Sequence, residues 1–460
     1  MQQKQTSTGL IWFQNNLRVT NNSSLFDCCK KHDKVIAVYI FDKHIFNNAV
    51  FEFPKIDKFR AKFLLESVTD LKQQLANLNI TLLSYFDYSD VVISNLCKEF
   101  QISEIFIQKE WTSEEIEIVN HVREKISSEI TIAETYDQFL YHPNDIEISF
   151  ADIPKVFTLF RKHLEKNIAI RNEVKIPKKL ADNLIDNKTE IPTLHQLGFE
   201  KFEQPTFSAF PFAGGETSAH KRIEHYFFET KKLGFYKQTR NGLVGTDYSS
   251  KLSAWLANGS ISAKTIYYKV KEYEQQFGSN QSTYWLIFEL IWRDFYANIL
   301  FSFPEVLGSA MKPAYNKIKW SSSTKNIEAW KSGQTGFPIV DAGMRQLNQT
   351  GYMHNRARLI VASFLVKTLM IDWRVGEEYF ASQLRDYDPA SNNGNWQWVA
   401  GSGADSQPYF RIFNPWEQTK SHDPNCEYIT TWVPELDDLS NKVILNWDTE
   451  FKNYDMDELN

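Results

Sequence analysis

Apolar residues occur in short runs in the first third of the chain. Runs at residues 9–13, 35–41, 80–85 and 102–107 are separated by polar residues and by stretches such as residues 58–75, where apolar positions recur at helical spacing. Short, continuously apolar runs that alternate with helical patterns are typical of buried parallel strands. The pattern therefore predicts an α/β domain with a doubly wound parallel sheet, which binds ligands beyond the carboxyl ends of its strands.

The second half of the chain has a helical pattern. Thr217 marks the start of a helix, and residues 284–296 are apolar almost all round, which predicts a buried helix. A second apolar helical run spans residues 359–370. Residues 167–211 are rich in Lys, Asn, Pro and Glu without strong periodicity, as expected for a connector. We predict three parts: an α/β domain at residues 1–135, a connector at residues 136–211, and an all-α domain at residues 212–460.

Composition bounds the class of protein. The chain has 460 residues, of which 42% are hydrophobic and 23% charged, which is ordinary for a soluble globular protein of two or three domains. The net charge of −6 argues against a uniformly basic nucleic-acid binder, but it leaves room for a local basic face. No spacing among the four Cys suits a zinc site, there is no secretory signal, and no apolar run could span a membrane. We therefore expect a cytoplasmic protein with reduced thiols and no membrane association.

Two features of the helical half suggest chemistry. Ser249, Ser250 and Ser253 surround Lys251 just before a predicted helix, where hydroxyl and ammonium groups and the helix N-terminus can bind a phosphate. An ordinary N-cap would explain one hydroxyl of this group, and that alternative stays open. Glycine motifs of the Rossmann or P-loop type are absent, so neither classical nucleotide site is supported.

The densest polar cluster lies in residues 350–415. Its conspicuous segments are residues 353–358, residues 371–374 and residues 386–398, which combine arginines, acids, amides and tryptophans. Such side chains are costly to bury without partners. The cluster therefore predicts a site for a large, polar, aromatic ligand.

These segments closely resemble the flavin-binding core of the photolyase/cryptochrome family. The resemblance extends from about Gly9 to about Leu436, and residues 12–18 resemble the family's opening motif, with Gln14 and Asn16 in place of Arg and Asp. It implies that the all-α domain is catalytic and binds FAD, with Arg358 and Asp386 as a buried pair against the isoalloxazine ring. By resemblance, the FAD-binding residues are Tyr236, Ser249, Ser250, Lys251, Leu252, Ser253, Arg358, Asp386, Asp388 and Asn392.

The same resemblance implies a DNA substrate and an electron relay. The substrate would be DNA that contains cyclobutane pyrimidine dimers, and the catalytic pocket would comprise Glu289, Trp292, Asn355, Arg356 and Trp398. Arg411 and Lys420, together with Arg356, would meet phosphates. Trp320, Trp373 and Trp396 match the family's relay to the flavin. The alternatives are an internal Glu289–Arg293 ion pair and ordinary core tryptophans.

The resemblance also implies an antenna pigment in the α/β domain. Glu110 follows a predicted strand at the point where folate-binding relatives have a Glu, so methenyltetrahydrofolate is the expected antenna. A deazaflavin antenna stays open, and so does the possibility that Glu110 is only a solvated loop acid.

Within the family the sequence favours a deoxyribodipyrimidine photolyase, a carbon–carbon lyase. Residues 280–294 resemble cryptochrome DASH, which suggests a preference for single strands, and residues 393–415 resemble class I photolyases. A neutral amide at Asn392 suits a fully reduced flavin, and Trp398 stands where DASH proteins usually have Tyr. Leu359 departs from both groups, and neither Asn355 nor Leu359 is the His of (6-4) photolyases. The alternative is a cryptochrome-DASH blue-light photoreceptor with little or no repair activity. We expect a monomer without a long C-terminal extension.

Overall fold

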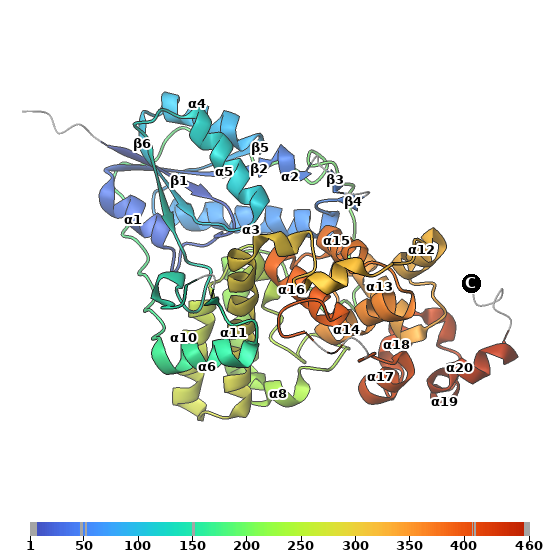
Figure 1. Ribbon diagram of the computed structural model, residues 1–460. Helices are drawn as coiled ribbons and strands as arrows, with labels where there is room; N and C mark the ends of the chain where they lie inside the picture. Colours follow the sequence, from blue (N-terminus) through green and yellow to red (C-terminus); the bar gives the residue numbers. More distant parts are fainter. Residues whose placement is uncertain are drawn as a thin grey trace, which may run out of the picture. The chain divides into compact units, whose positions relative to one another are not determined.

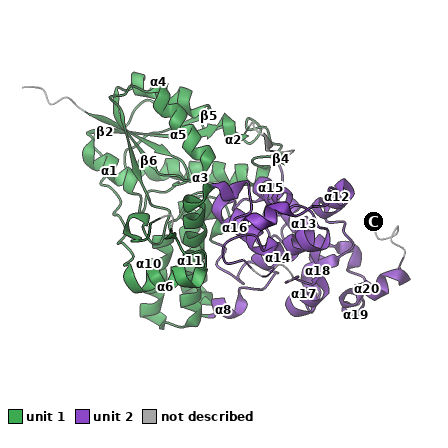
Figure 2. Cartoon of the chain, viewed as in Figure 1, with its two compact units in different colours: residues 1–201, 212–234, 252–304 green, residues 202–211, 235–251, 305–460 purple. Residues whose placement is uncertain are grey.

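The chain divides into two compact units (Figure 2). The computed structural model describes residues 7–46, 49–50, 53–149, 152–406, 408 and 411–454. Unit 1 comprises Met1–Lys201, Phe212–Gly234 and Leu252–Pro304, and unit 2 comprises Phe202–Pro211, Phe235–Lys251 and Glu305–Asn460. These units are groups of residues in contact, whereas the three parts predicted from the sequence are continuous segments, and the three-part division stays a prediction.

A sheet of five parallel strands lies within unit 1 (Figure 1). The strands are β1 (Thr8–Phe13), β2 (Lys34–Asp42), β5 (Leu82–Asp87), β6 (Ile102–Gln108) and β7 (Thr131–Thr135). Their order is β5-β2-β1-β6-β7, and Ile11 of β1 pairs with Ala37 of β2 on one side and with Phe106 of β6 on the other. The strand order reverses between β1 and β6, where ligands bind in sheets of this kind. A separate antiparallel pair joins β3 (Ala49–Val50) to β4 (Phe53–Pro54).

The side chains of the buried strands divide between two cores. In β1, Ile11 and Phe13 belong to one core, whereas Leu10 and Trp12 belong to the other. Because successive side chains of a strand point to opposite faces, helices cover both sides of the sheet. One core contains residues of α1 (Ser23–Lys31) and α3 (Lys58–Asn77), and the other contains residues of α4 (Ser89–Glu99) and α5 (Ser113–Lys125).

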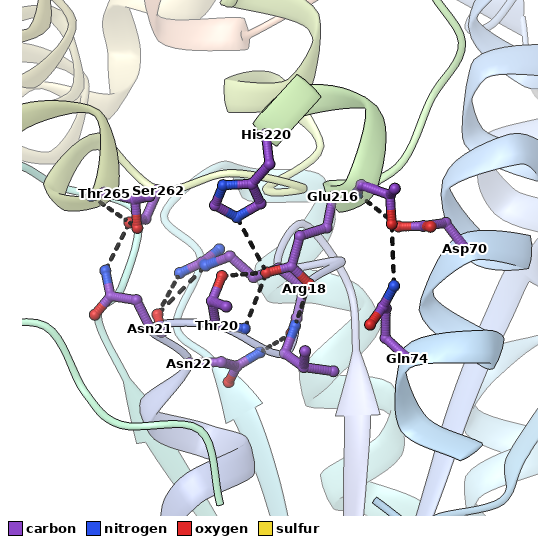
Figure 3. Close-up of polar contacts among 12 residues, drawn as sticks. Arg18, Thr20, Asn21, Asn22, Asp70, Gln74, Glu216, His220, Ser262 and Thr265 are labelled. Atoms are coloured by element: carbon purple, nitrogen blue, oxygen red, sulfur yellow. Dashed lines mark hydrogen bonds and ion pairs between the residues drawn. The ribbon is translucent and has the colours of Figure 1, made fainter. Parts of the chain in front are cut away.

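A buried polar network joins the segment after β1 to helices much later in the chain (Figure 3). Glu216, the first residue of α7 (Glu216–Ile223), accepts a 2.8 Å hydrogen bond from the backbone N–H of Val19. Arg18 is fully buried and donates only to backbone carbonyls, including that of Gly259 at 2.9 Å. Buried charges are tolerated when they are hydrogen-bonded in this way. The network explains why α7 belongs to the same unit as the sheet.

The remaining helices of unit 1 include the buried helix that the sequence predicts. They are α2 (Lys43–Phe46), α6 (Phe157–Asn167), α9 (Ser253–Ala257), α10 (Ala263–Phe277) and α11 (Gln281–Ser302). Asn280 caps α11 and forms a reciprocal capping box with Thr283. Asp294, fully buried in α11, accepts the backbone N–H groups of Leu140 and Tyr141, and burial raises its pKa to about 7.

Unit 2 is helical throughout its described secondary structure, apart from one isolated bridge. Its helices are α8 (Tyr236–Thr239), α12 (Thr324–Ser332), α13 (Pro338–Thr350), α14 (Asn355–Ser363), α15 (Trp373–Gln383), α16 (Pro389–Ala400), α17 (Pro415–His422), α18 (Glu427–Trp432), α19 (Asn441–Leu445) and α20 (Trp447–Glu450). The helical run predicted at residues 359–370 is divided, because α14 ends at Ser363 and a π-helical turn, Phe364–Thr368, follows. Such turns are frequent near functional sites.

The predicted fold class is confirmed: a doubly wound parallel sheet in the N-terminal part and an all-α C-terminal part. The connector predicted at residues 136–211 contains α6 and forms neither helix nor strand over residues 168–211. It is nevertheless fixed to the sheet, because the Asn183 amide bonds both the N–H and the carbonyl of Val35. In the described part of the chain, no helix has the length and apolar character needed to cross a bilayer.

Candidate functional site

A cavity lies within unit 2, between α14, α15 and α16, and has about 70 Å³ of space for water-sized molecules. One part of its lining is apolar and the other polar, which suits a flat aromatic ring with polar edges. The apolar lining is Leu359, Ala362, Phe380, Leu384, Trp396 and Val399, and the polar lining includes Asn355, Arg358, Asp386, Asp388, Ser391, Asn392 and Asn395.

The main charged feature of the cavity is the pair formed by Arg358 and Asp386. The Arg358 Nη2 donates to both carboxylate oxygens of Asp386, at 2.9 and 2.8 Å, and its Nε donates to the carbonyl of Met353 at 2.8 Å. The Asp386 side chain is 3% exposed and that of Arg358 is 25% exposed. Asp388 caps α16 by accepting the N–H of Ser391 at 2.8 Å. The pair therefore gives the cavity wall a fixed polar edge.

The orientation of the Asn392 amide is set by Glu377. Its Nδ2 donates to the backbone carbonyl of Glu377 at 2.9 Å and to the Glu377 Oε1 at 3.1 Å. Both amide hydrogens are thus used, and the carbonyl oxygen of Asn392 is the atom available to a ligand in the cavity. Burial, followed by the neighbouring Glu378, raises the pKa of Glu377 to about 8. Burial thus favours the neutral, protonated form of Glu377, and the amide of Asn392 is itself uncharged.

His354 connects the start of α14 to the C-terminal end of α8. Its Nε2 lies 2.7 Å from the carbonyl of Arg240, and its Nδ1 lies 3.1 Å from the N–H of Arg356, at the N-terminus of α14. The neutral tautomer with a proton on Nε2 satisfies both contacts. Burial, followed by Lys251, lowers the pKa of His354 well below its ordinary value. The ring is therefore neutral and holds two arginine-bearing segments together.

This histidine predicts a loss of stability in mild acid. Because the folded-state pKa is depressed, the unfolded chain takes up a proton first as the pH falls below about 6.5. At pH values below this, the free energy of unfolding should decrease, and this group should contribute a slope of up to about 1.4 kcal/mol per pH unit. Thermal unfolding of the wild type and of His354→Asn, which retains an N-capping oxygen, measures the effect. Equal slopes for the two proteins below that pH would contradict it.

The three predicted relay tryptophans all lie in unit 2. Trp396 is buried in α16 against α15, where a Cβ on Gly376 would stand 2.2 Å from its ring. Trp373 is buried at the start of α15. Trp320 is half-buried, and the adjacent Ser321 donates its N–H to the carbonyl of Met370 at 2.7 Å, which fixes Trp320 near the start of α15. Exposure therefore increases from Trp396 to Trp320.

The predicted phosphate-binding segment is divided between the two units. Ser249, Ser250 and Lys251 belong to unit 2, whereas Leu252 and Ser253 belong to unit 1, where α9 has only five residues. Lys251 is buried with φ +62°, and its Nζ donates to the Tyr352 hydroxyl at 3.1 Å. Tyr236, also in unit 2, is buried at the start of α8.

The predicted substrate residues are likewise found in both units. Glu289 and Trp292 lie on α11 of unit 1, and the Trp292 ring stacks on Phe157 at 3.7 Å. Arg293 donates to the carbonyl of Gln138 at 2.5 Å, so backbone contacts account for part of its bonding. In unit 2, Asn355 is exposed at the start of α14, and Trp398 is half-buried on α16.

Four cations in unit 2 form what we call the basic cluster: Arg240, Arg356, Lys367 and Arg411. Burial, followed by Arg240 and Arg411, lowers the pKa of Arg356, and the buried Nε of Arg356 has no hydrogen-bond partner among the described residues. Lys367 donates to the carbonyl of Arg411 at 2.6 Å, and burial followed by that arginine lowers its pKa to about 8. Like charges at this density favour an anionic ligand. Lys420 is exposed on α17 and pairs with Glu417 at 3.4 Å.

The reversal point of the sheet in unit 1 carries unsatisfied buried polar atoms. Glu110 accepts a 2.9 Å hydrogen bond from the Gln108 Nε2, which also donates to the carbonyl of Asn15 at 3.0 Å. The Oε1 atoms of Gln14, Gln108 and Gln138 are buried without hydrogen-bond partners among the described residues. Groups of this kind call for a ligand or water.

Comparison with known proteins identifies the family. Residues 9–179 match the DNA photolyase family, and residues 285–458 match the FAD binding domain of DNA photolyase. Cryptochrome DASH of Gloeobacter violaceus is 42% identical over 432 residues, which cover 94% of this chain and 86% of the relative. The chain belongs to the photolyase/cryptochrome family.

Solved structures of this photolyase/cryptochrome family agree with the whole fold. The Synechocystis cryptochrome has a TM-score of 0.92 and 38% identity, covering 98% of this chain and 94% of that one. A bacterial class III photolyase from Agrobacterium tumefaciens has a TM-score of 0.84 and 30% identity, covering 99% and 92%. The predicted cryptochrome-DASH-like membership is therefore confirmed, and the C-terminal part is an FAD-binding domain of photolyase type.

Several residues of this photolyase/cryptochrome site were not predicted from the sequence. Glu377 looks like an ordinary acid beside Glu378, and only its burial next to Asn392 reveals a role. Arg240 lies far along the chain from Arg356, and His354 joins them through backbone contacts. The position of His354 directly before a helical pattern was the sequence feature that could have indicated its role at the helix N-terminus.

Proposed function

We propose that the protein is a light-driven deoxyribodipyrimidine photolyase that splits cyclobutane pyrimidine dimers in DNA. The cavity in unit 2 carries the proposal, because it combines an apolar slot, the Arg358–Asp386 pair and the neutral Asn392 amide with a buried tryptophan. When bound, reduced FAD supplies the electron that opens the cyclobutane ring and afterwards takes it back.

The side chains that line this cavity suit FAD by their chemistry. The apolar wall would pack against the isoalloxazine ring, while Arg358 and Asp386 meet its polar edge. Asn392 would offer its carbonyl oxygen to a ring N–H, and a neutral acceptor of this kind suits a reduced flavin. Asp388 would lie near the ring system and sugar chain, and Tyr236 with residues 249–253 would bind the pyrophosphate.

The dimer would be bound after leaving the DNA helix. Extruding a damaged dinucleotide is cheaper than extruding an intact one, because its stacking and pairing are already weakened. We assign Trp292 and Trp398 to packing against the flipped bases. We assign Glu289, Asn355 and Arg356 to contacts with the polar edges of these bases. The Nε of Arg356, which has no hydrogen-bond partner in the described part of the chain, supports this assignment. The basic cluster, with Lys420, would hold the flanking phosphates.

Replacing Arg411 should weaken DNA binding without changing its dependence on sequence. Each lost phosphate contact lowers the slope of log affinity against log salt by about 1. Titration of a dimer-containing oligonucleotide at several salt concentrations, with wild type and Arg411→Ala, measures this slope. Lys442→Ala removes the same charge from an exposed position of α19 and serves as the control, with an unchanged slope expected. A slope unchanged by Arg411→Ala would remove Arg411 from the interface.

We also propose methenyltetrahydrofolate as an antenna in unit 1. The carboxylate of Glu110 and the unsatisfied amide oxygens near it are acceptors for the N–H groups of a pterin. A photolyase from Sulfolobus tokodaii, 30% identical with a TM-score of 0.78, is described with two FAD molecules, so a second chromophore has a precedent. Folate added to the protein should give an antenna absorption band that Glu110→Ala weakens, and an equal band in both proteins would argue against Glu110.

A blue-light photoreceptor with little repair activity is the second candidate. It is favoured by the relatives named cryptochrome DASH, such as that of Synechocystis at 40% identity over 94% of this chain. Repair of dimers by the reduced holoprotein distinguishes the two candidates, and a comparison of single-stranded with duplex DNA tests the expected single-strand preference. We further propose that the protein acts as a cytoplasmic monomer, which light scattering and fractionation of cells would test.

A further inference from the structure

A second line of aromatic rings starts at Trp396. Its ring centroid lies 6.2 Å from that of Trp330, with an interplanar angle of 72°. The Trp330 centroid lies 5.7 Å from that of Tyr379, at 63°. Phe380 packs against both indoles, at 5.0 Å from Trp396 and 6.2 Å from Trp330. All four residues belong to unit 2, and Trp330 and Tyr379 are not members of the tryptophan relay described above.

The surroundings of Trp330 allow it to pass an electron but not to release a proton. The side chain is among the largest that are fully buried, at 0% exposure. Its Nε1–H donates to the backbone carbonyl of Val361 at 3.0 Å, which is a weak base out of contact with water. An oxidised indole at this position keeps its proton and remains a cation, so the charge persists only until a neighbouring group supplies an electron.

Tyr379 is such a neighbour. Its hydroxyl donates at 2.7 Å to the Asn348 Oδ1, which is as weak a base as the carbonyl next to Trp330 but belongs to a half-buried side chain of α13 that water can reach. The Lys331 Nζ, 5.7 Å from the centre of the phenol ring, is paired with Glu328 at 2.9 Å. An oxidised phenol is a much stronger acid than an oxidised indole, so oxidation of Tyr379 is coupled to loss of the phenol proton. The product is a neutral phenoxyl radical.

We propose that Trp330 and Tyr379 form a second electron outlet from Trp396, parallel to the outlet through Trp373. The proposal rests on the proposed function, because it takes FAD in the cavity as the light-activated oxidant and Trp396 as its donor. Trp396 loses one electron to the flavin and becomes a radical cation. Trp330 gives one electron to Trp396, and Tyr379 gives one electron to Trp330. The Tyr379 phenol proton leaves along the hydrogen bond to Asn348 and is taken up by water, and an external thiol later restores the tyrosine with one electron and one proton.

The two outlets end on different chemical groups, which makes them separable. The Trp373 route ends on the half-buried Trp320 and should give a tryptophan radical. The Trp330 route should give a tyrosyl radical. Blocking Trp373 therefore directs all of the charge that leaves Trp396 into the second outlet.

The test uses the full-length holoprotein with oxidised FAD, illuminated with blue light in the presence of a thiol. The variants are Trp373→Phe, Trp373→Phe with Tyr379→Phe, Trp373→Phe with Trp330→Phe, and Trp396→Phe. Flavin reduction is followed by absorbance, and radicals are identified by transient electron paramagnetic resonance with ring-deuterated tyrosine. Tyr379→Phe removes one hydroxyl and keeps the ring packing, so its result does not depend on whether Trp330→Phe folds. Flavin content and unfolding temperature of each variant provide the folding controls.

We expect Trp373→Phe to retain photoreduction and to show a radical signal that narrows on tyrosine deuteration. Adding Tyr379→Phe should abolish that signal and slow net flavin reduction severalfold, while flavin content stays unchanged. The second outlet does not exist if Trp373→Phe gives no tyrosyl signal and if adding Tyr379→Phe or Trp330→Phe leaves the photoreduction of Trp373→Phe unchanged. The relay through Trp373 would still stand in that case. If Trp396→Phe itself leaves photoreduction intact, the proposed relay and the second outlet both fail.

Discussion

Replacing Asp386 by asparagine should give a protein that purifies without bound flavin and unfolds at a lower temperature. The substitution keeps the size of the side chain but removes the charge that the Arg358 guanidinium contacts at 2.9 and 2.8 Å. Breaking one partner of a buried pair costs about 3–5 kcal/mol, and the partial exposure of Arg358 places the expected loss near the lower end of that range. Loss of FAD adds to the effect, since a ligand that binds only the folded state stabilises it.

The matched control for Asp386→Asn is Glu435→Gln. Glu435 pairs with Arg345 at 2.6 Å, and their side chains are 25% and 21% exposed, but neither lines the cavity. An ion pair of this exposure contributes about 0–1 kcal/mol. Glu435→Gln should therefore keep its flavin and most of its stability. Denaturant unfolding and the flavin absorbance per protein measure both quantities, and an Asp386→Asn protein with full flavin content would exclude the pair from cofactor binding.

Substituting alanine for Gly376 should displace Trp396 and impair flavin photoreduction. A Cβ at this position of α15 would stand 2.2 Å from the Trp396 ring and 2.6 Å from the side chain of Leu365. Neither neighbour is the free end of a flexible chain, since Trp396 and Leu365 are buried at 2% and 0% exposure. Overpacking of a well-packed core costs about 1–3 kcal/mol, which exceeds the roughly 1 kcal/mol that alanine gains over glycine in a helix.

Gly308→Ala is the matched control for Gly376→Ala. Gly308 lies in the same unit, and a Cβ there would meet no atom within 4 Å. Its substitution should leave stability and photoreduction near the wild-type values. Unfolding in denaturant and the rate of flavin reduction under blue light measure both variants. If Gly376→Ala is as stable and as photoactive as Gly308→Ala, the close packing of Trp396 on α15 is not required.

Local patterns were sufficient to predict the fold class. Residues 9–13 and 35–41 became β1 and β2 with boundaries shifted by one residue, because their alternating side chains enter the cores on both faces of the sheet. The π-helical turn after Ser363 was not predicted, since an apolar run has the same sequence pattern whether the helix is regular or widened. Tertiary packing decides that difference.

The site was only partly accessible from sequence. The family resemblance suggested the Arg358–Asp386 pair, and the structure contains it. The Glu377–Asn392 contact was out of reach, because no local pattern shows that one of two adjacent acids is buried. For the same reason Trp330 looked like any core tryptophan, and its 6.2 Å approach to Trp396 depends on the packing of α12 against other helices of the unit.

Repair of a defined lesion tests the central claim most directly. The holoprotein is fully photoreduced and illuminated with oligonucleotides that contain one cyclobutane dimer, in single-stranded and duplex form, and the recovery of pyrimidine absorbance is followed. Samples kept in the dark and undamaged oligonucleotides are the controls. We expect recovery in the light only, faster with the single strand. Absence of recovery, with the flavin fully reduced and the DNA bound, would contradict the photolyase assignment and favour a photoreceptor.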